Sequence, residues 1–180
     1  MQALKTTILK RLLIFLPLHL VLAVAYGQAS LNCQCDGLVD PNFTESIPIY
    51  DYPKGRLVQQ IRHNIKNEDY LVFTIDKDSA EYFHLMFSYA INGRSYAGWV
   101  RKGKMFGIYP RAYSDKLPIY SKPNNTADKS GNIAPGEINF LTILRCRNNW
   151  VFIKLNYKKT NNTGWLRKQD QCDNPYTTCN

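Results

Sequence analysis

The chain has 180 residues, of which 23 are lysine or arginine and 14 are aspartate or glutamate, giving a formal net charge of +9 at pH 7. This length allows one domain of ordinary size or two small ones. The basic residues are scattered rather than run together, which is typical of a charge that serves solubility, so we predict no nucleic-acid partner.

Residues 1–27 have the pattern of an export signal. Lys5, Lys10 and Arg11 form a basic start, and the apolar run that follows ends at Ala25. This run is short for a membrane span, which needs about 20 apolar residues. We therefore expect a secreted or periplasmic protein with no membrane span after signal cleavage. The alternative is an uncleaved signal that serves as an anchor.

Residues 28–46 form a predicted N-terminal arm ahead of the first regular element. Turn-forming pairs such as Asp36-Gly37 and Asp40-Pro41 dominate it, and no hydrophobic period is visible. The arm also carries Cys33 and Cys35, two of the five cysteines in the chain.

The first predicted barrel covers residues 47–103. Residues 70–75 are rich in β-branched and aromatic side chains and end at a turn, which favours a strand. Residues 82–89 alternate, which indicates a strand with one buried face. Its two faces are Phe83, Leu85, Phe87 and Tyr89 on one side and Tyr82, His84, Met86 and Ser88 on the other. Asn92-Gly93 then predicts a tight hairpin.

Residues 104–116 join the copies as a linker or as a closing strand, and the sequence alone leaves both open. The second predicted barrel covers residues 117–180 and repeats the pattern of the first. Residues 151–155 alternate as a half-buried strand does, and Asn161-Asn162 is predicted to turn the chain back.

Three landmarks occur twice in the same order. Gly98-Trp99-Val100-Arg101-Lys102 returns as Gly164-Trp165-Leu166-Arg167-Lys168, and Pro48-Ile49-Tyr50 returns as Pro118-Ile119-Tyr120. Between them, residues 82–89 and 150–157 align without a gap. This order indicates an internal duplication. Short strands joined by turns, with no helical spacing beyond the signal, predict an all-β fold of two tandem small barrels.

The second copy resembles a bacterial SH3 domain. The residues that carry the resemblance are Pro118-Ile119-Tyr120, Gly136-Glu137, the strand that begins at Trp150, and Thr163-Gly164-Trp165-Leu166. The first copy is looser, because it has Tyr82 where tryptophan is expected and no clear Gly-Glu. The resemblance implies SH3-like barrels of five strands in an exported bacterial protein. Many such domains bind cell-wall peptides or target wall hydrolases.

Aromatic side chains that point away from the barrel cores are the candidate ligand-binding residues. If Val151 and Ile153 face the core, a period of two places Trp150 on the opposite face, and the same phase places Tyr82 outside in the first copy. Near Tyr120 and Tyr50, these rings would form a stacking wall for a peptide. The alternative is that Trp150 covers the open end of its barrel. The predicted ligand-binding residues are Tyr50, Tyr52, Tyr82, Tyr120 and Trp150.

Two other tryptophans and the cysteines carry structural predictions. Trp99 and Trp165 are expected to pack in the cores. Cys172 and Cys179 flank a short segment that can turn back on itself, so they are the expected disulfide. Cys33 and Cys35 are too close in sequence to bond to each other. One of them could pair with Cys146 and leave a thiol, and that choice stays open.

The residue inventory gives little support to catalysis or metal binding. His63 and His84 are the only histidines after the signal, and both are expected to be ordinary surface residues. Cys33-Gln34-Cys35 fits no standard zinc spacing, so no metal and no other cofactor is predicted. We expect a non-enzymatic protein that binds a cell-envelope ligand, such as a peptidoglycan peptide. The alternative is a module that docks to another exported protein.

Overall fold

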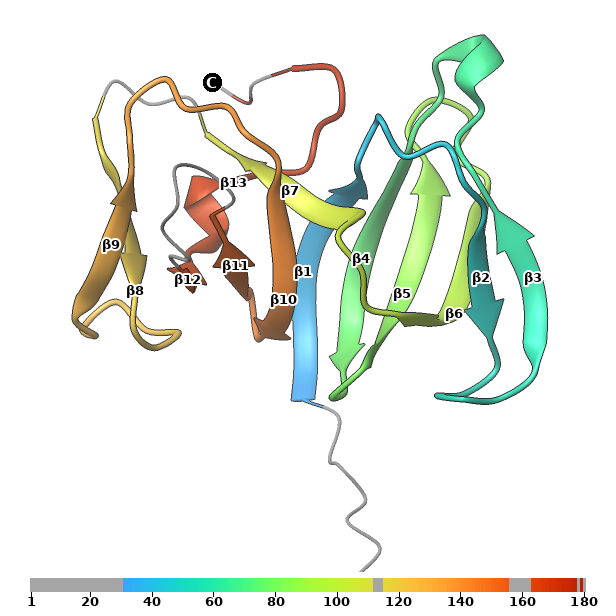
Figure 1. The fold of residues 1–180 in the computed structure, drawn as a ribbon, viewed down its shortest axis with the longest axis horizontal. Helices are drawn as coiled ribbons and strands as arrows, with labels where there is room; N and C mark the ends of the chain where they lie inside the picture. Colours follow the sequence, from blue (N-terminus) through green and yellow to red (C-terminus); the bar gives the residue numbers. More distant parts are fainter. Residues whose placement is uncertain (1–30, 112–114, 156–162, 178, 180) are drawn as a thin grey trace, which may run out of the picture.

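The computed structural model describes residues 31–111, 115–155 and 163–177, together with Cys179. These residues form an all-β protein, with two short 3₁₀ turns and no α-helix in the described ranges (Figure 1). The strands are β1 (Leu31–Val39), β2 (Ile47–Tyr50), β3 (Leu57–Ile61), β4 (Leu71–Asp78), β5 (Tyr82–Tyr89), β6 (Ser95–Arg101), β7 (Phe106–Pro110), β8 (Leu117–Tyr120), β9 (Lys129–Ile133), β10 (Leu141–Arg147), β11 (Trp150–Lys154), β12 (Thr163–Leu166) and β13 (Gln171–Cys172). The 3₁₀ turns are η1 (Ile65–Asn67) and η2 (Lys168–Asp170).

The predicted export signal and the predicted turn at Asn161-Asn162 lie outside the described residues. A helix of the length and apolarity needed to cross a bilayer does not occur in the part of the chain that the structure describes.

The strands follow one another in a single open antiparallel sheet. Their order is β3-β2-β6-β5-β4-β1-β7-β10-β11-β12-β8-β9, and β13 pairs with β7. The sheet does not close on itself, so two tandem barrels are not confirmed. Figure 1 shows two lobes that meet where β1 lies beside β7. Two residue pairs, Leu38 with Gly107 and Val39 with Phe106, join the edge strands of the two lobes into one sheet.

The two halves of the sheet repeat each other strand for strand. We call β1 to β6 the first half and β7 to β12 the second half, because the strand order reads the same outward from the β1–β7 junction. The hairpins β2–β3 and β8–β9 are each bulged just before the shared tyrosine. That tyrosine is the register partner of the shared tryptophan in both halves, as Tyr50 with Trp99 and as Tyr120 with Trp165. The repeated landmarks therefore occupy equivalent places.

Strand β1 lies inside the predicted N-terminal arm, and the expectation that this arm lacks a regular element is wrong there. It pairs along most of its length with β4 and at Leu38 and Val39 with β7. Its glycine is required by packing, since a Cβ on Gly37 would lie 2.7 Å from the ring of Phe73 and 2.8 Å from the carbonyl oxygen of Gly107. The connection between the copies likewise contains strand β7, which favours the closing-strand alternative over a plain linker.

Strand β5 alternates as predicted, with Phe83, Leu85 and Phe87 buried and Met86 exposed. One continuous apolar core extends through both halves of the sheet. The branched and aromatic side chains of β4 and β5 supply half of its residues in the first half, as their strand propensity leads us to expect.

The glycine of each repeated Gly-Trp packs against the isoleucine of the repeated Pro-Ile-Tyr. A Cβ on Gly98 would lie 2.5 Å from the side chain of Ile49, and a Cβ on Gly164 would lie 3.2 Å from Cβ of Ile119. Gly98 also has φ of 154°, in a region that favours glycine. The two shared phrases therefore form one packing contact, which explains why they recur together.

Two disulfides are present among the described residues. The expected pair, Cys172–Cys179, is confirmed. The second disulfide joins Cys35 of β1 to Cys146 of β10, and Cys33 retains its thiol. This resolves the alternative that the sequence left open and ties the first half covalently to the second.

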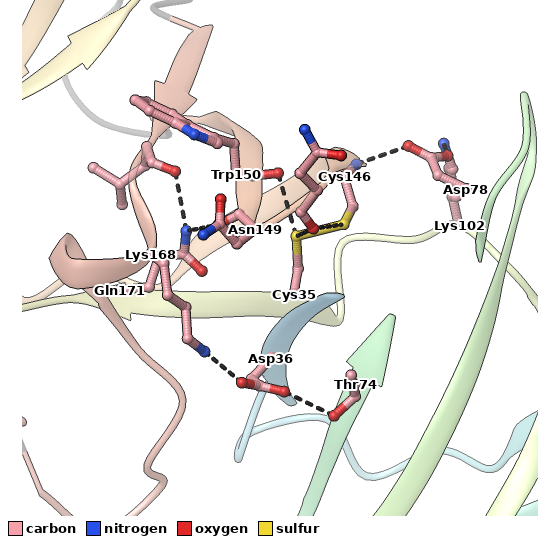
Figure 2. Close-up of a disulfide and its surroundings, with 12 residues drawn as sticks. Cys35, Asp36, Thr74, Asp78, Lys102, Cys146, Asn149, Trp150, Lys168 and Gln171 are labelled. Carbon is pink, nitrogen blue, oxygen red and sulfur yellow. Dashed lines mark hydrogen bonds and ion pairs between the residues drawn. A yellow bond between two sulfur atoms is a disulfide. The ribbon is translucent and has the colours of Figure 1, made fainter. Parts of the chain in front are cut away.

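Charged contacts surround the Cys35–Cys146 disulfide (Figure 2). The Lys102 ammonium pairs with the buried Asp78 carboxylate, whose other oxygen accepts a hydrogen bond from the backbone N–H of Cys146 at 2.7 Å. On the other side, Lys168 pairs with Asp36, which also accepts from a threonine hydroxyl of β4. The Cys146–Asp78 hydrogen bond and the Lys168–Asp36 ion pair each join a residue of the first half to a residue beyond β7.

Candidate functional site

A row of aromatic side chains crosses the outer face of the first half, on the side opposite the core. The ring of Tyr82 lies edge to face against Tyr50 with centroids 6.3 Å apart. Tyr50 is the register partner of Trp99, whose ring centroid is 5.3 Å from that of His84. We call Tyr82, Tyr50, Trp99 and His84 the aromatic row.

Most of the aromatic row is partly open to solvent. Tyr50, Trp99 and His84 are half-buried, and Tyr82 at the end of the row is only 9% exposed. Tyr52, at the turn after β2, is 60% exposed. The Nδ1 atom of His84 lies 2.6 Å from a carboxylate oxygen of Asp76, so the row ends in a polar pair that can exchange hydrogen bonds with a ligand.

The equivalent rings of the second half are covered. Tyr120 and Trp150 lie edge to face with centroids 5.4 Å apart, and Trp165 completes their cluster. Ala127, from the loop between β8 and β9, packs against this cluster, and the Arg167 guanidinium lies 5.6 Å from the centroid of the Tyr120 ring. Tyr120 and Trp165 are 5% and 7% exposed, in contrast to the half-buried Tyr50 and Trp99. This cluster stabilises the second half and offers little surface to a ligand.

The outward phase predicted for Trp150 and Tyr82 is found, because Val151 and Phe83, their neighbours, face the core. The structure thus brings Tyr82 together with Tyr50, and Trp150 together with Tyr120, but leaves Tyr52 apart at its turn.

The prediction that Trp99 and Trp165 pack in the cores is confirmed for Trp165, which is buried, and wrong for Trp99. Trp165 belongs to the outer cluster of the second half, and Trp99 is half-buried in the aromatic row. The glycine before each tryptophan is the residue that faces inward, against Ile49 or Ile119, and the period of two turns the next side chain outward.

A hollow of about 480 Å³ lies at the loop end of the first half and was not predicted. Its walls come from the connection between β3 and β4, which carries η1, and from the hairpin between β5 and β6. Arg62, Lys66 and Arg94 line it, together with His63 and Tyr89. These residues come from two segments, residues 62–66 and 89–94, which are distant from each other in sequence, so no local pattern joins them. A comparison of the two copies does point to this region. The connection between β3 and β4 contains arginine, histidine and lysine, whereas the equivalent residues 134–140 of the second copy contain none of the three.

His63 is buried, so the expectation of an ordinary surface residue is wrong. Its Nδ1 accepts a hydrogen bond from the backbone N–H of Leu71 at 2.9 Å, which leaves Nε2 to donate to the carbonyl oxygen of Asp40 at 3.1 Å. Burial lowers the pKa of His63 below its ordinary 6.5, although the hydrogen bond to Asp40 and the charge of Asp40 act in the opposite direction. The neutral ring therefore fixes the floor of the hollow to the arm that follows β1.

Stability is expected to fall as the pH drops below about 6.5, because the unfolded chain binds the His63 proton more readily than the folded chain does. Above that pH, the contribution of the neutral ring is fully present. Urea unfolding of the wild type and of His63→Gln between about pH 5 and pH 8 measures this contribution, since glutamine can keep one acceptor and one donor but does not titrate. A pH dependence that is equal in both proteins would contradict this assignment.

The described residues contain no group of three or more histidine, cysteine, aspartate or glutamate side chains that could hold a metal ion.

No family model matches the chain, and no curated protein and no solved structure matches it either. The resemblance to bacterial SH3 domains therefore stays a prediction.

Proposed function

We propose that the chain is an exported, non-enzymatic binding protein made of two SH3-like modules, and that the first module holds a cell-envelope ligand on its aromatic row. The ligand class that suits such a row is an extended peptide, such as the peptide of peptidoglycan. Flat rings with one open edge provide a large contact area at little cost in side-chain entropy.

The observation that carries the proposal is the difference between two equivalent surfaces. In the second half, Ala127 and Arg167 cover the rings. In the first half, Tyr50 and Trp99 keep solvent-accessible surface at the same positions. Packing alone favours covering a large ring, so rings left partly open support a binding role.

Retention on purified peptidoglycan is expected to weaken about tenfold or more in Trp99→Ala and to weaken also in Tyr52→Ala, because a central aromatic residue commonly contributes about 2 kcal/mol to an interface. Tyr176→Ala is the matched control for Tyr52→Ala, since Tyr176 is also an exposed tyrosine but lies in the C-terminal tail, whereas Tyr52 follows the strand that carries Tyr50. Sedimentation with peptidoglycan measures retention, and thermal unfolding confirms that each variant is folded. Equal retention of the wild type and Trp99→Ala would overturn the proposal.

The second candidate function is docking to another exported protein. The observation that favours it is the free outer edge of β3, where Leu57 and Val58 are exposed at one end of the open sheet. An edge strand with exposed apolar side chains can add a strand from a partner. Crosslinking from an envelope extract separates the two functions: a single protein attached through β3 favours docking, and a wall fragment attached through the aromatic row favours the first function.

A further inference from the structure

The hollow in the first half concentrates positive charge. Arg62, Lys66 and Arg94 all line it, and within the described ranges none of the three has a carboxylate within ion-pair distance. Burial raises the pKa of Tyr89 in the wall, Tyr96 and the charge of Asp69 add to this effect, and the charges of Arg94 and Arg62 oppose it. A concave surface that carries one sign of charge attracts a ligand of the other sign.

The nearest buried carboxylate, that of Asp69, is committed to a structural role. It accepts hydrogen bonds from the backbone N–H of Ile91 at 2.8 Å and of Asn92 at 3.2 Å, and also from the side-chain amide of Asn92. Asp69 therefore holds the β5–β6 hairpin in place and does not line the hollow. The three cations face the hollow without a carboxylate among its described lining residues.

The walls of the hollow are held in place from several directions. The hydroxyl of Tyr89 donates to the carbonyl oxygen of Arg62 at 2.7 Å. The tail closed by the Cys172–Cys179 disulfide also supports the loop, because the hydroxyl of Tyr176 donates to the carbonyl oxygen of Glu68 at 2.8 Å and its ring packs against Tyr70. His63 anchors the loop through hydrogen bonds of its two ring nitrogens to the backbone of Asp40 and Leu71. A site held in this way loses little entropy when a ligand binds.

One wall of the hollow, the connection between β3 and β4, has no basic equivalent in the second half, and the equivalent of the other wall lies outside the described residues. The equivalent connection of the second half, residues 134–140, replaces the basic residues with Ala134-Pro135-Gly136-Glu137. The basic lining is therefore not a general consequence of the repeated sheet.

We propose that this hollow binds an oxyanion, a phosphate or sulfate group, carried on a body of about the size of a sugar. Guanidinium groups match the oxygens of phosphate and sulfate through paired hydrogen bonds, and lysine adds a mobile charge. A volume of about 480 Å³ exceeds what a single small ion fills and lies in the range of small-molecule sites. Tyr89 and the apolar Ile65 in the lining give the uncharged part of such a ligand a surface to lie on.

Calorimetric titration of the oxidised full chain tests the site with four probes: glucose 6-phosphate, glucose 6-sulfate, glucose and inorganic phosphate. We expect both charged sugars to bind, glucose not to bind, and inorganic phosphate to bind more weakly than glucose 6-phosphate. Affinity should fall as salt is raised, because the contacts are between exposed charges. The ratio of the two charged sugars tells whether phosphate or sulfate is preferred.

The variant Arg62→Gln/Arg94→Gln should bind the better charged sugar about tenfold more weakly or worse, since a hydrogen bond to a charged group contributes about 1.5–3 kcal/mol. Arg56→Gln/Arg101→Gln is the matched control, because it removes the same charge from exposed arginines of the first half outside the hollow. An equal loss in both variants, or no binding by the wild type, overturns the proposal.

The site is independent of the peptidoglycan proposal, because the aromatic row and the hollow share no residue. Trp99→Ala should leave binding of the charged sugars unchanged, and Arg62→Gln/Arg94→Gln should leave retention on peptidoglycan unchanged. Either function can therefore fail without the other.

Discussion

Replacing Cys35 and Cys146 together with alanine is expected to lower the free energy of unfolding by about 5 kcal/mol. The two cysteines are 111 residues apart in sequence, so their disulfide greatly restricts the unfolded chain. The matched control is Cys172→Ala/Cys179→Ala, whose partners are only 7 residues apart. The same chain-entropy relation gives a loss of about 2.5 kcal/mol for that short loop.

Urea unfolding without reductant measures both losses, and Cys33→Ser in each background removes the remaining thiol from the comparison. Equal losses in the two double variants would contradict the expected dependence on loop length. In the native chain, burial raises the pKa of the Cys33 thiol to about 12, and the charge of Asp78 adds to this effect while that of Lys102 opposes it. Since the thiolate is the attacking species in disulfide exchange, Cys33 should leave the neighbouring Cys35–Cys146 disulfide intact at neutral pH.

Replacing Lys102 with methionine is expected to lower the free energy of unfolding by about 3–5 kcal/mol, because it leaves a buried carboxylate without its cation. Lys102 pairs with Asp78 and also donates to the carbonyl oxygen of Leu144 at 3.1 Å, so it joins the two halves of the sheet. Because methionine keeps most of the side-chain volume, the loss in free energy of unfolding reports the contribution of the ammonium group.

Lys168→Met is the matched control for this prediction. Lys168 pairs with Asp36, but both side chains are about a third or more exposed and the pair is screened by water. Such a pair contributes about 1 kcal/mol or less. Chemical denaturation measures the loss in free energy of unfolding for both variants. Losses that agree within error would contradict the expectation that the buried Asp78 makes its ion pair the more stabilising of the two.

Much of the local structure could be predicted from the sequence, and for a clear reason. Strands β5 and β11 each bury one face, and burial on one face leaves an alternating pattern that a single strand carries by itself. The repeated Gly-Trp and Pro-Ile-Tyr phrases also marked equivalent places correctly, because they form one packing contact in each half. When the same contact occurs twice within one chain, the residues that form it appear twice in the sequence and can be recognised there.

Strand β1 and the continuous sheet could not be predicted in this way. The segment Cys33-Gln34-Cys35-Asp36-Gly37 has few strand-forming residues, and it is part of a strand because β4, from a distant part of the chain, pairs with it, while β7 pairs with Leu38 and Val39 that follow. The contacts that join the halves, such as Cys35 with Cys146, connect residues that no local pattern relates.

For the candidate site, the sequence predicts which face of the sheet the aromatic side chains occupy, but not how much of each side chain is exposed to solvent. A period of two tells which face Trp150 occupies, and it does so correctly. It cannot tell that Ala127 and Arg167 cover that face in the second half while Tyr50 and Trp99 remain partly open in the first. The hollow was missed for a related reason, since Arg62 and Arg94 come from two loops that only the folded sheet brings together.

The pairing of β1 with β7 has a consequence for the origin of the chain. These strands hold equivalent places in the two halves, beside β4 and beside β10, and they run antiparallel to each other. Two identical subunits related by a two-fold axis join their edge strands in the same manner. A single-copy ancestor with such a strand had the geometry to form a homodimer, and gene fusion would turn that subunit interface into the centre of one polypeptide.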